Sequence, residues 1–118
     1  RVLADANRLE QVLVNLFTNA LDAMAITPVR RLEVTVEADG NTTVIRVRDT
    51  GMGLSEAVRA RLFEPFFTTK EQGTGLGLGL AISEGIVREF SGSLKASGRP
   101  EGGAEFSIYL RTYREGNP

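Results

Sequence analysis

Three polar side chains recur along one segment near the start of the sequence, Asn15, Asn19 and Asp22. In a helix these spacings of four and three residues place them within about 60° of one another. An amide oxygen is a hard ligand suited to Mg²⁺, but one or two amides alone bind it weakly. We therefore predict a cleft, with Arg8 and Gln11 extending its polar edge, in which substrate phosphates complete a magnesium shell. The alternative is that Asn15 and Asn19 are ordinary polar helix residues.

A second group, Asp49, Gly51 and Gly53, follows a run of strand-like residues. A carboxylate in a pocket can accept a hydrogen bond from an exocyclic amine such as that of adenine. Glycines beside it let the backbone approach a flat ring closely. These residues predict a base-binding site, and the alternative is a plain Asp-Gly turn.

A third group is the glycine-rich stretch 73–78 (GTGLGL), which stands immediately before a helical pattern. Backbone N–H groups at a helix start can cradle phosphate when glycines remove side-chain bulk. The stretch lacks the Gly-Lys-Ser/Thr of a P-loop and the βαβ surroundings of a dinucleotide site. Lys70, just upstream, could neutralise phosphate charge. The alternatives are a flexible linker for the glycines and a solvated surface side chain for Lys70.

Composition excludes several kinds of chemistry. The 118 residues include no cysteine and no histidine, and 42% of them are hydrophobic. The chain therefore has no thiolate nucleophile and no phosphorylatable histidine of its own, and any metal must be a hard cation held by oxygens. The net charge of −1 does not indicate a nucleic-acid surface. No apolar run reaches the roughly 18 residues that span a bilayer, so we expect no direct membrane contact.

Apolar periodicity predicts two main helices. The first begins after Asp5 as N-cap, and its apolar stripe is Leu9, Val12, Leu13, Leu16, Phe17, Ala20, Leu21 and Met24. The second has the stripe Leu80, Ile82, Ile86, Val87 and Phe90, with Gly92 as its C-cap. Ser55 is positioned to cap a short helix over 56–62. Residues 63–74 have no clear period and predict a loop anchored by phenylalanines.

Alternating apolar residues predict half-buried strands in two hairpins. Their apolar positions are Leu32, Val34 and Val36, then Val44, Ile45 and Val47, then Leu94 and Ala96, then Phe106, Ile108 and Leu110. Residues 39–41 (DGN) and 98–103 are the expected turns. Residues 1–4 are expected to be the end of a truncated strand, and 112–118 a frayed tail that starts just after Arg111. The order predicts one α+β domain over 1–118: a two-layer sandwich with an antiparallel or mixed sheet and helices on one face.

In this order, the pieces resemble the ATP-binding domain of sensor histidine kinases, in the superfamily shared with gyrase, Hsp90 and MutL. Residues 15–23 (NLFTNALDA) resemble its N box, 49–54 (DTGMGL) its first glycine box and 63–70 (FEPFFTTK) its F box. Residues 73–78 resemble its second glycine box, and 103–106 (GAEF) its closing Gly-x-x-Phe element. The residues of the F box and the Asp22-Ala23 pair are most similar to those of dicarboxylate-transport and nitrogen-regulation sensors. The resemblance implies the Bergerat-type ATP-binding fold.

The resemblance also implies roles for the matching residues. Asn19 would hold Mg²⁺, with Asn15 nearby on the metal or the phosphates. Asp49 would bind the adenine amine, and Gly51 and Gly53 would shape the base pocket.

Residues 52–74 would form the ATP lid, from which Lys70 would reach the phosphates. The other residues that would bind ATP are Thr69, Gly73, Gly75, Leu76, Gly77 and Leu78.

One position in the resemblance separates kinase from hydrolase. Gyrase and Hsp90 relatives carry a water-activating glutamate four residues before the metal-binding asparagine, where this chain has Asn15. The implied activity is transfer of the γ-phosphoryl group of MgATP to a histidine on a separate dimerisation domain, and a response regulator would be reached indirectly. The domain would be cytoplasmic, within an inner-membrane sensor. The alternatives are a non-catalytic ATP-sensing module and a gyrase-type ATP-hydrolysing clamp.

Overall fold

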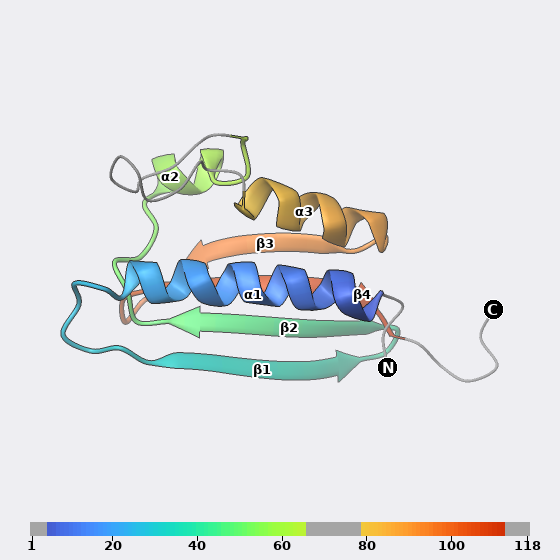
Figure 1. Ribbon diagram of the computed structural model, residues 1–118. Helices are drawn as coiled ribbons and strands as arrows, with labels where there is room; N and C mark the ends of the chain where they lie inside the picture. Colours follow the sequence, from blue (N-terminus) through green and yellow to red (C-terminus); the bar gives the residue numbers. More distant parts are fainter. Residues whose placement is uncertain (1–4, 66–78, 113–118) are drawn as a thin grey trace.

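A computed structural model describes residues 5–65 and 79–112 (Figure 1). Its elements are α1 (Ala6–Ala23), β1 (Leu32–Asp39), β2 (Thr42–Asp49), α2 (Glu56–Arg61), α3 (Gly79–Glu89), β3 (Ser93–Gly98) and β4 (Ala104–Arg111). This order confirms the predicted helices and hairpins. The expected strand over 1–4, residues 66–74 of the predicted lid and the residues from 113 onward lie outside the described part.

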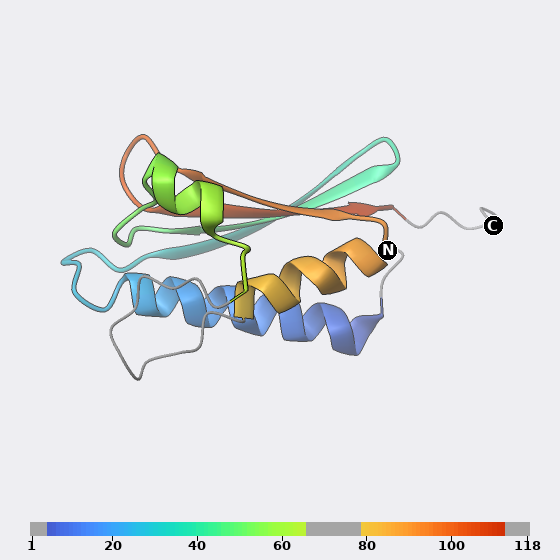
Figure 2. The same cartoon turned by 90° about the horizontal axis from the view of Figure 1, so that it is seen from above.

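The strands form a four-stranded antiparallel sheet in the order β1-β2-β4-β3. Helices α1 and α3 lie side by side on one face of it, as Figure 2 shows. The predicted two-layer α+β sandwich is therefore confirmed. Between the layers, alternate residues of three strands form the core with α1 and α3: Ile45, Val47, Leu94, Ala96, Phe106, Ile108 and Leu110.

Helix α1 begins where the sequence predicts. The Asp5 carboxylate accepts the N–H groups of Asn7 at 2.9 Å and Arg8 at 3.1 Å, which satisfies two donors that the first turn leaves unpaired. Leu16 is fully buried at the centre of the stripe. The prediction that Leu21 belongs to the buried stripe is wrong, because its side chain is 60% exposed. It lies about 140° around the helix from Leu16, away from the buried side.

Helix α3 corrects a second stripe assignment. Ile82 is 45% exposed, whereas the neighbouring Ser83 is completely buried. Ser83 stands three residues after Leu80 and four before Val87, so it faces the core with them. A hydroxyl tolerates that position only with a hydrogen-bond partner, and Asn15 of α1 provides one at 3.1 Å.

The end of α3 also differs from the prediction. The Gly92 N–H donates to the Val87 carbonyl and the Ser91 N–H to the Arg88 carbonyl, which is the pattern of a Schellman motif. The left-handed residue is Ser91, with φ +61°, and not Gly92. Gly92 is required for a different reason, since a Cβ there would overlap the carbonyl of Tyr109 in β4.

Replacing Ser91 by glycine should stabilise the fold. A non-glycine residue in the left-handed region costs about 1–2 kcal/mol, and the greater freedom of glycine in the unfolded chain cancels part of the gain. We expect Ser91→Gly to raise the free energy of unfolding by about 0.5–1 kcal/mol in urea titrations. A Ser91→Ala chain, which keeps the strain, should show no such gain; equal stability of the two variants would contradict this account.

Among the described strands, β1 lies at the edge of the sheet, and its apolar side chains are largely exposed. Val34 lies opposite Val47, and Val36 opposite Ile45, so they share the helix-facing side of the sheet. Yet Val34 is 47% exposed and Val36 65% exposed, because α1 lies over the middle of the sheet and does not extend across β1 (Figure 1). The prediction of a half-buried strand holds for β2, but it is wrong for β1.

The predicted fraying point is also corrected. Arg111 completes β4, and the Thr112 N–H donates to the Asn41 carbonyl at 2.7 Å. The hydroxyls of Thr43 and Thr112 lie 2.7 Å apart and form a further hydrogen bond. Residues 111 and 112 are thus held by the β1–β2 turn and the start of β2.

Candidate functional site

Asp49, the last residue of β2, is a buried carboxylate. Its side chain is 1% exposed, and its Oδ1 accepts the N–H groups of Gly51 at 2.9 Å and Ala104 at 3.3 Å. The Gly51 bond is the local turn contact that the alternative interpretation anticipated. The Ala104 bond comes from β4, 55 residues away, and a turn alone does not require it. Within the described residues both bonds end on Oδ1, which leaves Oδ2 able to accept another donor.

The glycines after Asp49 allow close approaches between backbone segments. A Cβ on Gly51 would lie 2.6 Å from the carbonyl oxygen of Ala23, at the end of α1. Gly53 has φ +84°, and its Cα faces the carbonyl of Gly103. The Met52 N–H donates to the Ala23 carbonyl at 3.2 Å. These contacts bring the end of α1, the end of β2 and the β3–β4 turn together around Asp49.

Asn15 connects the two main helices. Its amide nitrogen donates to the Ser83 hydroxyl at 3.1 Å and to the Gly79 carbonyl at 3.4 Å, both in the first turns of α3. Because a carbonyl can only accept, the Gly79 contact fixes the orientation of the amide. The amide oxygen of Asn15 is therefore the atom left for a ligand.

Asn19 lies one turn further along α1, toward the end that contacts Gly51. It is partly buried, and its side chain makes no hydrogen bond within the described residues. Asn15 and Asn19 therefore lie along the same edge of α1. Asn15 is beside α3, and Asn19 is nearer the end of α1 that contacts Gly51. Their metal-binding role stays a prediction.

Seven predicted site residues fall on 66–78 and lie outside the described residues: Thr69, Lys70, Gly73, Gly75, Leu76, Gly77 and Leu78. The flanking structure fits one part of the prediction. Helix α3 begins at Gly79, directly after the glycine-rich stretch. Its first carbonyl is bonded to Asn15, so this helix start lies beside the predicted amide pair.

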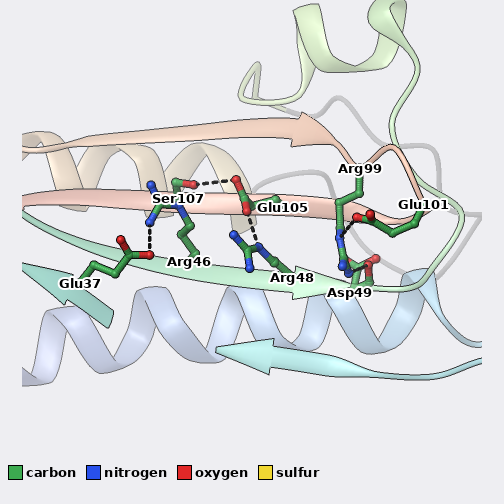
Figure 3. Close-up of polar contacts among 8 residues, drawn as sticks. All are labelled: Glu37, Arg46, Arg48, Asp49, Arg99, Glu101, Glu105 and Ser107. Atoms are coloured by element: carbon green, nitrogen blue, oxygen red, sulfur yellow. Dashed lines mark hydrogen bonds and ion pairs between the residues drawn. The ribbon is translucent and has the colours of Figure 1, made fainter. Parts of the chain in front are cut away.

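The sequence interpretation missed two residues that contact the predicted site, Ser83 beside Asn15 and Arg99 beside Asp49. Ser83 resembled any polar helix residue, and only its place between Leu80 and Val87 could have indicated burial. Arg99 belongs to no motif, yet its Nη1 donates to the Asp49 carbonyl at 3.0 Å, and its Nε pairs with Glu101 at 3.1 Å (Figure 3).

The face of the sheet opposite the helices carries charged pairs. Arg48 pairs with Glu105 at 2.5 Å, and Arg46 with Glu37 at 2.8 Å (Figure 3). The hydrogen bond and the negative charge of Glu105 raise the pKa of the Arg48 guanidinium. Arg48 and Glu105 stand opposite each other in the last rung of the β2–β4 ladder, so this pair braces the strand end that carries Asp49.

Two broader features limit what else the described part can do. Among residues 5–65 and 79–112, no three His, Cys, Asp or Glu side chains gather into a metal-binding cluster. Every helix in the same residues is too short or too polar to cross a lipid bilayer.

Comparison with known proteins identifies the family. Residues 4–114 match the model of the histidine kinase-, DNA gyrase B-, and HSP90-like ATPases. The C4-dicarboxylate transport sensor protein DctB of Pseudomonas aeruginosa is 46% identical over 110 residues, which are 92% of this chain and 18% of DctB. The chain thus spans about a fifth of the length of such relatives. This similarity agrees with the predicted resemblance to dicarboxylate-transport sensors.

Solved structures agree with the sequence comparison. The catalytic domain of histidine kinase ThkA superposes with a TM-score of 0.79 at 33% identity, covering 92% of this chain and 68% of that one. Full-length ShkA in complex with AMPPNP gives a TM-score of 0.80 at 35% identity, covering 95% of this chain and 23% of ShkA. The chain belongs to the histidine kinase-, DNA gyrase B- and HSP90-like ATPase family, and its relatives within that family are the catalytic domains of sensor histidine kinases.

Proposed function

We propose that this chain binds ATP with Mg²⁺ and transfers the γ-phosphoryl group to a histidine on a separate dimerisation domain of the same sensor kinase. The observation that carries the proposal is the buried Asp49 carboxylate, which two backbone N–H groups hold through one oxygen. The complex of the similar kinase ShkA with AMPPNP supports the ligand class.

Asp49 is suited to read the adenine amine. A buried carboxylate is costly unless donors satisfy it, and the two N–H groups on Oδ1 satisfy it only in part. The 6-amino group of adenine would complete the set by donating to Oδ2. Gly51 and Gly53 would border the base, because their lack of side chains leaves only backbone beside the ring.

The donor set fits a magnesium ion that enters with the nucleotide. Mg²⁺ prefers oxygen ligands and is usually held by one or two protein groups together with substrate phosphates. Asn19 would supply one amide oxygen, and Asn15, whose nitrogen is already occupied by α3, would present its oxygen to the metal or the phosphates. Bound Mg²⁺ would draw charge from the phosphate oxygens. Lys70 and the cradle of Gly73, Gly75 and Gly77 would contact those phosphates.

Asn15 favours transfer over hydrolysis. An amide cannot take a proton from water, and here its N–H₂ group is committed to Gly79 and Ser83. A neutral imidazole needs no such base, because its unprotonated nitrogen is already nucleophilic. That nitrogen would form the new N–P bond while the bond from phosphorus to the bridging oxygen breaks, and ADP would leave. The chain's task is then to position and neutralise the phosphates.

The partners follow from the missing acceptor. The chain has no histidine, so the phosphoryl group must pass to another domain. We place that histidine on the dimerisation domain of the parent kinase, from which a response regulator would take the phosphoryl group. We also place the domain in the cytoplasm, as part of an inner-membrane sensor.

Transfer in trans tests the proposal. The chain is mixed with a purified dimerisation domain from a DctB-type kinase and γ-labelled ATP, and label on histidine is measured after alkaline and acid treatment. We expect acid-labile label with Mg²⁺, loss of at least about a hundredfold in rate for Asn19→Ala, and little change for Asn7→Ala, which removes an exposed asparagine from the same helix. A folded chain that binds ATP yet transfers nothing would favour the non-catalytic ATP-sensing alternative.

A further inference from the structure

The turn between β3 and β4, together with the first residue of β4, contacts Asp49 at three points. Arg99 donates from Nη1 to the Asp49 carbonyl at 3.0 Å, and the Ala104 N–H donates to the carboxylate at 3.3 Å. Gly103, with φ +91°, lies so close that a Cβ would overlap the same carbonyl. The turn therefore holds the main chain of this residue, and the start of β4 holds its side chain.

These contacts change the last rung of the sheet. The β2–β4 register ends with Arg48 opposite Glu105. One position further on, Ala104 donates its N–H to the side chain of Asp49 and does not extend the register. The Asp49 carbonyl then needs another donor, since a buried acceptor left unpaired is costly, and the Arg99 guanidinium is that donor.

We propose that Arg99 is a positioning residue that orients the Asp49 carboxylate and thereby sets the preference for adenine. The inference rests on the proposed function of Asp49. Anchoring the carbonyl fixes the peptide plane and hence the direction of the Cα–Cβ bond. The two N–H groups on Oδ1 then fix the rotation of the carboxylate, so Oδ2 points in one direction.

An arginine suits this place better than a lysine. Its side chain is 15% exposed, and its rigid fork serves two acceptors at once, the Asp49 carbonyl through Nη1 and Glu101 through Nε. Glu101 is 66% exposed and holds the guanidinium from the solvent side. A lysine could reach one of these acceptors but could not span both in the same geometry.

Calorimetric titration of ATP and of GTP into the 118-residue chain tests the inference. We expect Arg99→Ala to weaken ATP binding about tenfold with GTP binding nearly unchanged, the size expected of coupled neighbours. Arg99→Lys should recover part of the loss. Arg46→Ala serves as the control. Arg46 pairs with Glu37 on the face of the sheet opposite the helices, and its loss should leave both affinities unchanged. In an Asp49→Asn background, Arg99→Ala should have no further effect on ATP.

The other outcomes separate this inference from the proposed function. Equal losses for ATP and GTP in Arg99→Ala would show general loosening and would overturn the positioning role, as would full ATP preference in a folded Arg99→Ala chain. If circular dichroism shows that Arg99→Ala is unfolded, the Glu101→Gln variant tests the role instead. We expect it to lose ATP preference two- to threefold. An unchanged ATP preference in this variant would overturn the positioning role. Unchanged ATP binding in Asp49→Asn would instead overturn the base-reading function, and this inference with it.

Discussion

Asp49→Asn will bind ATP at least about a hundredfold more weakly than the parent chain and will remain folded. The geometry gives the reason. The N–H groups of Gly51 and Ala104 both donate to Oδ1, so the amide oxygen of the new asparagine must take that place. Its N–H₂ group then stands where Oδ2 was and faces the adenine amine, donor against donor. Two unpaired donors at a buried site cost about 3–5 kcal/mol, which corresponds to a loss of a hundredfold or more.

Two further ligands, inorganic triphosphate and GTP, test whether the loss of ATP affinity depends on the adenine base. Titration with inorganic triphosphate should show almost no change, because it has no base for Asp49 to contact. GTP, which presents a carbonyl oxygen where adenine has its amine, should gain relative to ATP. Equal losses for ATP and triphosphate would show that Asp49 acts on the fold or the phosphates and does not read the base.

Gly103→Ala will lower the free energy of unfolding by about 3 kcal/mol or more. Its Cβ would overlap the buried Asp49 carbonyl, and φ +91° is strained for any side chain. The clashing atoms belong to the backbone of Asp49 and Thr50, so they cannot turn aside as a flexible side chain would. For a domain of this size, the melting temperature should fall by at least about 10 °C.

The adjacent glycine supplies a matched control. Gly102 has a similar φ of +101°, but a Cβ there would meet open space. Gly102→Ala should therefore show only the cost of backbone strain, about 1–2 kcal/mol. The difference between the two variants, followed by circular dichroism, measures the contact with Asp49. Similar melting temperatures would mean that the turn can move away from the strand end.

The sequence predicted what depends on local pattern. The α1 stripe apart from Leu21, the Asp5 and Ser55 caps and both hairpins each rest on neighbouring residues, and the structure confirms them. Side-chain period cannot tell which strand lies at the edge of a sheet. Val34 and Val36 have the same alternation as Val47, yet only Val47 lies beneath a helix.

The site was predictable in its motifs but not in its supports. Asp49 and Asn15 stood out because carboxylates and amides beside glycines or an apolar stripe imply a ligand. Their partners come from distant parts of the chain: Ser83 is 68 residues from Asn15, and Arg99 is 50 from Asp49. Such pairings depend on how α3 and the β3–β4 turn fold back, which no local spacing encodes.

Within the described residues no strand pairs with the outer edge of β1, so a segment that bound there would couple the folding of this chain to association. The outer backbone groups of β1 and the side chains of Val34 and Val36 can be covered by any extended segment, and such a cover binds the folded form alone. By mass action, each tenfold rise in the concentration of a saturating cover adds about 1.4 kcal/mol to the apparent stability. Where copies of this chain supply that cover, the melting temperature rises with protein concentration, and the concentration must then be stated with it.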